Sequence, residues 1–239
     1  MIQAVRRIGV IGDVHAEHAR LAGALDWLAG QRLDAVLCTG DVADGAGCID
    51  QSCALLRDAG VLTVAGNHDR WLLTERMRHV ADAHRADALA DATLDYLRNL
   101  PRTRELDTVA GRLLLCHGIG EHDMGKVWPG TRGPESIRRS EALDALIAAD
   151  RHRLIVHGHL HYRVLIDFES LSVINAGTLK GPQPGVSIID FEAGTVAAFD
   201  LDDHAVPRER VTHSLVPEPP RRVWRSTADF DGCWQPVLL

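Results

Sequence analysis

The first 70 residues contain three short apolar runs, and each run ends in carboxylate, amide or imidazole side chains. The runs are residues 8–11, 35–38 and 61–65. The side chains at their ends are Asp13 and His15, Asp41 and Asp44, and Asn67 and His68. Apolar runs that end in this way are typical of buried parallel strands, whose carboxyl ends share one edge of a sheet. The pattern therefore predicts that these distant side chains meet.

Each of these runs is followed by a helical pattern. Leucines recur at helical spacing within residues 21–30, and helices are also predicted over residues 49–59 and from Trp71 onward. This alternation implies parallel strands joined by right-handed crossovers. Residues 70–100, which end before Pro101, predict one or two outer amphipathic helices.

Two later apolar runs end in histidines. The runs are residues 112–116 and 154–156, and the histidines are His117, His159 and His161. A helix is predicted between the two runs, from about Glu135 to Ala149. His157 alternates away from His159 on an extended chain, so we expect it to be structural.

After His161 the pattern changes to short apolar runs separated by turns, without helices. These runs are residues 164–168, 172–175, 186–191 and 196–201. They indicate an antiparallel second sheet. We therefore predict an α/β protein built as a four-layer α-β-β-α sandwich, in which a mixed or parallel sheet packs on a second, more antiparallel sheet. Residues 1–206 are expected to form one domain, and residues 207–239 an extension that packs on it or on a partner.

Composition limits the class of protein. A chain of 239 residues that is 46% hydrophobic can bury one large core. A net charge of −7 without a basic run argues against binding to duplex nucleic acid. Five cysteines without paired spacing, no signal segment and no membrane-spanning run predict a reducing cytoplasm and no membrane partner. The pattern predicts no particular oligomeric state.

The side chains at the ends of the runs are suitable ligands for divalent cations. Carboxylates with imidazoles suit manganese, iron or zinc, and the lack of thiolates argues against a structural zinc site. A carboxylate that bridges two ions fits the separation of about 3.5 to 4 Å seen in two-metal hydrolases. Such a centre keeps a net positive charge and attracts a phosphate ester. The alternative is that Asp13, Asp41 and Asn67 only cap helices.

The motifs resemble those of the calcineurin-like metallophosphoesterases. Asp-x-His, Gly-Asp-x-x-Asp, Gly-Asn-His-Asp, a lone His-Gly and Gly-His-x-His follow one another between Gly12 and His161. The resemblance implies two divalent ions, with Mn²⁺ expected and Fe, Zn, Ni, Co or Mg as alternatives. It assigns Asp13, His15 and His161 to one ion, Asn67, His117 and His159 to the other, and Asp41 to both.

The same resemblance implies a mechanism in which a metal-bridging hydroxide attacks the phosphorus. His68 would be the general acid that protonates the leaving oxygen, and Asp44 would orient its ring. An adjacent carboxylate suits this role because it stabilises the imidazolium.

Departures from the family pattern favour a phosphodiesterase. The protein phosphatases and symmetrical dinucleoside tetraphosphatases of this family usually carry an arginine after the second aspartate of Gly-Asp-x-x-Asp, whereas this chain has Gly45. That arginine would bind the extra negative charge of a monoester. Residues 175–178, Asn-Ala-Gly-Thr, are similar to a turn in the small bacterial phosphodiesterase-like branch. The alternatives are a nucleotide, dinucleoside polyphosphate or protein phosphomonoesterase, and a non-enzymatic metal-binding scaffold.

Residues 118–134 are rich in glycine and lack periodicity, which is typical of a loop. A long loop beside a metal site is often functional, and a solvated connection is the alternative. The candidate substrate-binding residues in it are His122 and Arg132, together with Asp123, Lys126 and Trp128.

Overall fold

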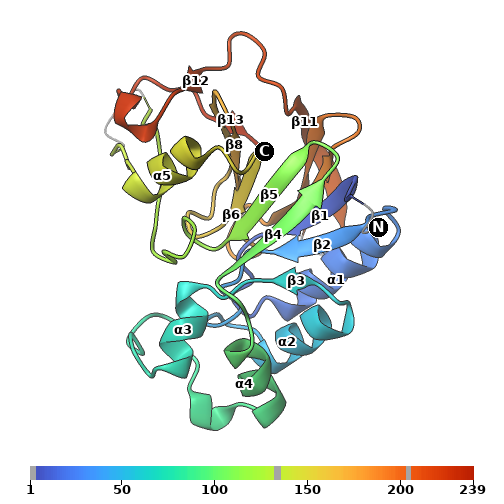
Figure 1. Cartoon of the computed structure of the whole chain (residues 1–239). Helices are drawn as coiled ribbons and strands as arrows, with labels where there is room; N and C mark the ends of the chain where they lie inside the picture. The colour runs from blue at the N-terminus through green and yellow to red at the C-terminus, as the bar shows by residue number, and fades with distance from the viewer. Residues whose placement is uncertain (1–3, 132–135, 203–205) are drawn as a thin grey trace.

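The computed structural model describes residues 4–131, 136–202 and 206–239. Two sheets pack face to face, with helices on their outer sides (Figure 1). The first sheet has the order β11-β10-β9-β1-β2-β3, and the second has the order β12-β7-β8-β6-β5-β4, with β13 paired to β7. The first comprises β1 (Arg7–Ile11), β2 (Ala35–Cys38), β3 (Leu62–Thr63), β9 (Gly185–Asp190), β10 (Thr195–Leu201) and β11 (Pro207–Ser214). The second comprises β4 (Thr103–Thr108), β5 (Gly111–Cys116), β6 (Leu154–His157), β7 (Arg163–Phe168), β8 (Ser172–Ala176), β12 (Val223–Trp224) and β13 (Val237–Leu238).

Helices cover both outer faces of the sandwich. They are α1 (His18–Ala29), α2 (Ile49–Asp58), α3 (Asn67–Leu73), α4 (Asp91–Arg98) and α5 (Glu141–Ala149), with short 3₁₀ turns η1 (Ala86–Ala88) and η2 (Thr227–Asp229). The buried faces of α1, α2 and α4 pack on the first sheet, and α5 packs on the second. The predicted four-layer α-β-β-α sandwich is confirmed.

Alternation along β5 shows how one strand serves two layers of the core. Leu113 and Leu115 point between the sheets, where they join Ile8 and Val10 of β1. Leu114 and Cys116 are also buried, but they belong to the cluster beneath α5. Because successive side chains of a strand point to opposite faces, a strand buried on both faces is apolar throughout.

Parallel pairing aligns the strand ends that matter for the site. β1 pairs in parallel with β2, and β2 with β3. In the second sheet β6 pairs in parallel with both β5 and β8. The carboxyl ends of these strands therefore lie at one end of the sandwich.

The prediction that residues 186–191 and 196–201 belong to the second sheet is wrong. They form β9 and β10 of the first sheet, where β9 pairs antiparallel with β1 and β10 pairs antiparallel with β9. Both sheets consequently mix parallel and antiparallel pairs, and the second is not distinctly the more antiparallel one. Strands that are apolar on both faces fit either sheet, so their sequence does not select a partner.

The helix predicted from about Glu135 begins at Glu141. Ser140 ends the preceding extended segment, and its Oγ accepts a hydrogen bond from the Leu143 backbone N–H at 3.2 Å. A serine that caps the first turn fixes the start of a helix. Residues 132–135 lie outside the described residues.

The chain after residue 206 contacts both sheets. β11 forms the edge of the first sheet beside β10, and β12 and β13 both pair with β7 of the second. Trp224, Phe230 and Trp234 are buried in the cluster that also contains α5. Within the described ranges, no helix is both long and apolar enough to cross a membrane. All five cysteines are free.

Candidate metal centre

The side chains predicted as metal ligands converge at the carboxyl ends of the strands. Asp13 follows β1, Asp41 follows β2, Asn67 begins α3 directly after β3, His117 follows β5, and His159 and His161 follow β6. Both sheets therefore contribute ligands to one site. All of these residues are buried except His159, which is half-buried, and His161, which is exposed.

Two groups of possible metal-binding side chains lie next to each other, and they share one aspartate. The first cluster is Asp13, His15, Asp41 and His161, and the second cluster is Asp41, His117 and His159. Within each cluster the ligand atoms lie within 4.8 Å of one another. Asp41 is thus the carboxylate positioned between the two clusters.

Short distances between nitrogens and oxygens characterise the first cluster. The Nε2 atoms of His15 and His161 are 3.0 Å apart, and His161 Nε2 is 3.3 Å from Asp13 Oδ2. His15 Nε2 lies 3.9 Å from Asp41 Oδ2. Two imidazole nitrogens and two carboxylates that face one point form a donor set suited to a divalent cation.

In the second cluster, an amide joins the imidazoles and the carboxylate. His117 Nε2 is 3.0 Å from the Asn67 side-chain oxygen and 3.3 Å from Asp41 Oδ2. His159 Nε2 is buried, and no atom of the described residues is hydrogen-bonded to it. A buried nitrogen without a partner is costly, and a bound cation would satisfy it.

Backbone carbonyls orient two of the histidines. His15 Nδ1 lies 2.9 Å from the Asp44 carbonyl oxygen, and His117 Nδ1 lies 2.8 Å from that of Thr39. A carbonyl only accepts, so each Nδ1 carries a hydrogen and each Nε2 is the ring nitrogen that faces the clusters. Metal-binding histidines are typically held by such hydrogen bonds.

The buried carboxylates of Asp13 and Asp41 favour positive charge nearby. Burial by itself lowers the pKa of His117, but the charges of Asp41 and Asp13 outweigh burial and raise it to about 10. Those carboxylates would stabilise a cation in the same way. By contrast, burial and the nearby charge of His117 lower the pKa of His159 to about 4, which keeps its ring neutral and able to bind a metal. The residues present therefore fit divalent cations in both clusters.

Left-handed backbone conformations bring these groups together. His15, Asp41, Asp44, His159 and His161 all have φ between 45° and 68°. Such angles are uncommon outside glycine and concentrate at functional sites. After β1, β2 and β6 the chain therefore turns at left-handed residues that lie in or next to the clusters.

Two glycines allow the loops to approach closely. A Cβ atom on Gly66 would overlap Asp41, and one on Gly158 would overlap the Asp13 carboxylate. The loops before Asn67 and His159 can reach the aspartates only because these positions carry no side chain.

His68 and Asp44 form a hydrogen-bonded pair beside the first cluster. His68 Nδ1 is 2.8 Å from Asp44 Oδ2, and the rings of His68 and His15 pack edge to face at 4.9 Å. Burial lowers the pKa of His68, but the hydrogen bond to Asp44 and the charge of Asp41 outweigh it and raise the pKa above its usual value. The pair thus favours a protonated ring with Nε2 free to donate.

The family follows from a comparison over most of the chain. A family model described as the calcineurin-like phosphoesterase superfamily domain matches residues 7–204. The chain belongs to this superfamily. Its members are metal-dependent hydrolases of phosphate esters that bind divalent metals, so this protein is such a phosphoesterase.

Similar proteins span nearly the whole phosphoesterase. An uncharacterized protein of Methanocaldococcus jannaschii is 22% identical over 231 residues, which covers 87% of this chain and 88% of that protein. A metallophosphoesterase from Sphaerobacter thermophilus has a TM-score of 0.63 at 22% identity and covers 84% of this chain and 89% of its own. An archaeal phosphodiesterase has a TM-score of 0.54 at 16% identity, with 82% and 99% covered. These structural likenesses support the sandwich fold.

Arg78 is a part of the phosphoesterase site that the sequence did not reveal. Its guanidinium donates to both oxygens of Asp44, at 2.9 and 2.8 Å, and to the carbonyl oxygens of His84 and Arg76. The backbone N–H of His84 also donates to Asp44, at 3.0 Å. Arg78 lies in an arginine-rich stretch without a motif, so no sequence signal separated it from its neighbours.

Asp69 and the turn after β8 also brace the site. Asp69 accepts hydrogen bonds from the backbone N–H groups of Ala43 and Gly66, each at 2.9 Å, and so joins two ligand loops. The Thr178 hydroxyl donates to the Asp13 carbonyl oxygen at 2.8 Å. The motifs included both residues, but only the structure reveals what they hold.

The predicted substrate-binding residues separate into different surroundings. His122 is exposed on a turn, where its backbone pairs with Ile119. Asp123 is bound to Arg70 through two hydrogen bonds of 2.5 and 3.0 Å. Lys126 and Trp128 line a cavity beside His159. Arg132 lies outside the described residues.

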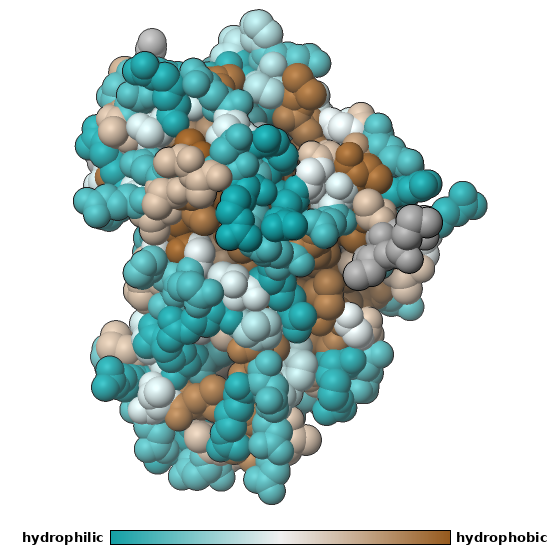
Figure 2. All heavy atoms as spheres, in the orientation of Figure 1, coloured by the Kyte–Doolittle hydropathy of each residue, from teal (hydrophilic) through white to brown (hydrophobic). Residues whose placement is uncertain are grey.

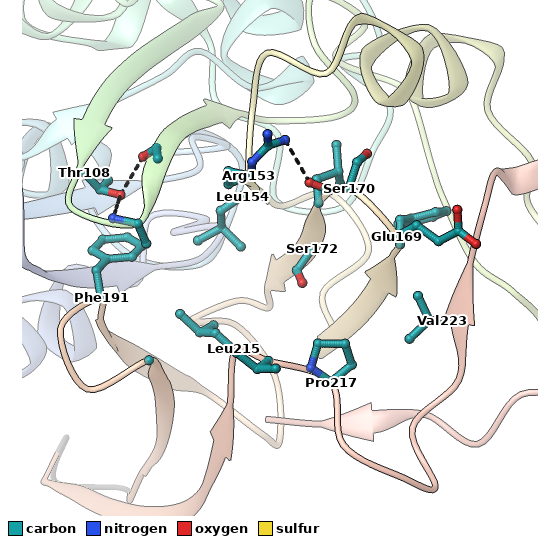
Figure 3. A pocket seen from close by; sticks show the side chains of 16 residues that line it. Thr108, Arg153, Leu154, Glu169, Ser170, Ser172, Phe191, Leu215, Pro217 and Val223 are labelled. Atoms are coloured by element: carbon teal, nitrogen blue, oxygen red, sulfur yellow. Dashed lines mark hydrogen bonds between the residues drawn. The ribbon is translucent and has the colours of Figure 1, made fainter.

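A second, apolar cavity lies at the opposite end of the phosphoesterase. Its volume is about 420 Å³, and its lining includes residues at the amino ends of β5, β6 and β8 (Figure 3). Labelled residues around it include Leu154, Phe191, Leu215 and Val223. On the face shown in Figure 2, hydrophobic residues form separate patches within a largely hydrophilic surface.

Proposed function

We propose that this phosphoesterase is a phosphodiesterase that uses two divalent cations. The observation that carries the proposal is the position of Asp41, which belongs to both clusters. Asp13, His15 and His161 would hold one cation, Asn67, His117 and His159 the other, and Asp41 both. When bound, such ions lower the pKa of water and stabilise the negative charge of phosphate oxygens. The donor set suits Mn²⁺, with Fe, Zn, Ni, Co or Mg as alternatives.

His68 is proposed as the general acid. Hydrolysis adds the oxygen of water to phosphorus and breaks the bond to the leaving oxygen, which needs a proton. The His68 ring is anchored through Nδ1 by Asp44, so its Nε2 is the atom able to donate. Asp44 positions the ring and is itself held by Arg78. A positioned general acid contributes about 10²- to 10⁴-fold to the rate.

The surroundings of Asp44 support a diester as the substrate. A side chain at position 45 has no room, since a Cβ atom on Gly45 would overlap the His15 backbone. Arg78 is close, but its nitrogens are engaged by Asp44, His84 and Arg76. Neither residue therefore offers a free guanidinium for the additional negative charge that distinguishes a monoester.

The test is metal-dependent hydrolysis of two chromogenic esters. The purified protein, loaded with Mn²⁺, is assayed with bis(p-nitrophenyl) phosphate and with p-nitrophenyl phosphate. We expect kcat/KM to be at least about tenfold higher for the diester, the value of one missing charge-assisted hydrogen bond. Asp41→Asn should remove both metal-dependent turnover and the binding of two Mn²⁺ ions measured by calorimetry.

Each other outcome contradicts part of the proposal. A preference for the monoester would favour the nucleotide or protein phosphomonoesterase alternative. Tight binding of Mn²⁺ without turnover of either ester would favour a metal-binding scaffold. Binding of a single ion that survives Asp41→Asn would contradict the shared carboxylate.

A further inference from the structure

A cavity of about 400 Å³ opens beside the second cluster. It is lined by Lys126, Trp128, Ser136, Arg138, His159, Leu160 and Tyr162. His159 belongs to both the cavity and the second cluster. The cavity is therefore adjacent to the second cluster, so that one molecule can reach both. Pockets of roughly 300 to 1,000 Å³ accommodate small-molecule ligands.

Two cationic side chains line this cavity without acidic partners among the described residues. Lys126 and Arg138 are exposed, and neither side chain has an ion pair or hydrogen bond within those ranges. Arginines elsewhere, such as Arg70 and Arg222, are paired with aspartates. Lys126 lines the same cavity as His159. In a chain with a net charge of −7, Lys126 and Arg138 form a local positive region that would attract an anion.

Two aromatic rings form another part of the lining. Trp128 is almost buried, and its ring packs against Trp234 with centroids 5.2 Å apart. Tyr162 is 59% exposed, and its ring centroid is 5.8 Å from that of Trp128. An exposed tyrosine supported by a fixed tryptophan offers a surface on which a flat ring can stack.

The backbone holds the cationic and aromatic parts of the cavity together. Trp128 and Arg138 exchange two backbone hydrogen bonds, of 3.0 and 2.8 Å. The two residues are therefore fixed side by side, although nine residues separate them in the chain. A rigid arrangement of this kind reduces the entropy lost when a ligand binds.

We propose that this cavity binds a nucleotide arm of the substrate. The phosphorus to be attacked lies at the clusters. A second phosphate of the substrate lies at Lys126 and Arg138, and the base of the nucleotide arm stacks on Tyr162. The inference rests on the proposed function, because it assigns the cavity to the same reaction. It narrows the substrate class to phosphate esters in which one ester group carries a nucleotide.

Calorimetric binding of ADP to the Mn²⁺-loaded protein tests the assignment. We expect Lys126→Ala and Arg138→Ala each to raise the Kd of ADP about tenfold, as for the loss of one charge-assisted contact. Tyr162→Ala should raise it by about 5- to 100-fold, the range for base stacking. Ribose 5-phosphate, which has no base, should bind with a Kd that Tyr162→Ala leaves unchanged. Arg98→Ala, an exposed change on α4, is the matched control.

Parallel assays separate this inference from the proposed function. If the wild type hydrolyses bis(p-nitrophenyl) phosphate but the three variants bind ADP with the Kd of the wild type, the nucleotide site is wrong and the diesterase proposal stands. If ADP binding responds as expected without diester hydrolysis, the diesterase proposal is wrong and the nucleotide site stands. Equal effects of Tyr162→Ala on ADP and ribose 5-phosphate would overturn the stacking role.

Discussion

The two ends of the sandwich use the same strands for opposite purposes. At the carboxyl ends of β1, β2, β5 and β6, buried carboxylates and imidazoles face one another, and left-handed residues hold them there. At the amino ends of β5, β6 and β8, a cavity lined by Leu154, Phe191 and Leu215 is mostly apolar. The strands between the ends are apolar on both faces.

This contrast teaches where the fold tolerates unfavourable local structure. Clustered charges and positive φ angles cost free energy, so the surrounding structure must hold them in place. At the metal end, hydrogen bonds that Thr39 and Thr178 donate and that Asp69 accepts do this. The hydrogen bonds at the apolar end, such as that from Thr108 to the Gly111 carbonyl oxygen, do not hold clustered carboxylates or imidazoles. Changes at the metal end should therefore alter chemistry, and changes at the apolar end should alter stability.

Among changes that leave the proposed metal ligands intact, His68→Ala is expected to have the largest effect, and that effect is on turnover. We expect kcat for diesters with poor leaving groups to fall by about 10²- to 10⁴-fold, because the leaving oxygen loses its proton donor. Metal content should stay the same, since His68 is not one of the proposed ligands. The measurement is steady-state kinetics with a series of aryl esters, alongside elemental analysis. His79→Ala, at an exposed histidine, is the control, and full activity of the His68 variant on poor leaving groups would contradict the acid role.

A change at the apolar end should have the reverse signature. Leu171 is 3% exposed and packs with Phe168 and Trp224. Leu171→Ala should lower the free energy of unfolding by about 3 kcal/mol, from lost burial and the cavity left behind. Urea unfolding of the metal-free protein measures this, and kcat should remain within about twofold of the wild type. A large loss of kcat at unchanged stability would break the contrast between the ends.

The smallest effect is the pH dependence that Asp44 gives to stability. Burial raises the pKa of Asp44, but hydrogen bonds from His68, Arg78 and His84 outweigh it and hold the pKa at about 2, below the ordinary 3.8. Since the folded pKa is depressed, this stabilisation is present above the unfolded pKa and is lost as the pH falls toward the folded one.

Comparison of Asp44→Asn with the wild type isolates that contribution. The stability advantage of the wild type should shrink by about 1 kcal/mol between pH 5 and pH 3, measured by urea unfolding without metal. The difference between Leu171→Ala and the wild type should stay constant over the same interval. An Asp44→Asn difference that does not change with pH would show that the carboxylate is not held as described.

The sequence predicted the sandwich and the convergence of the ligand side chains because both depend on local pattern. An apolar run that ends in aspartate or histidine records a strand and its polar end, as at Asp13 and His117. The roles of individual ligands remain predictions. Local pattern does not predict strand order, since β9 fits either sheet. The antiparallel pairing of β9 with β1 depends on contacts between residues that are distant in sequence. The position of Arg78 next to Asp44 depends on the path of residues 74–85, which carries no motif.

Each cluster takes ligands from opposite halves of the sandwich. Asp41 follows a strand of the first sheet, whereas His161 of the first cluster and His117 and His159 of the second follow strands of the second sheet. A cation bound in either cluster would therefore cross-link the two sheets. The concentration of free cation would then affect the stability of the folded protein as well as its turnover, and the melting temperature would rise with that concentration.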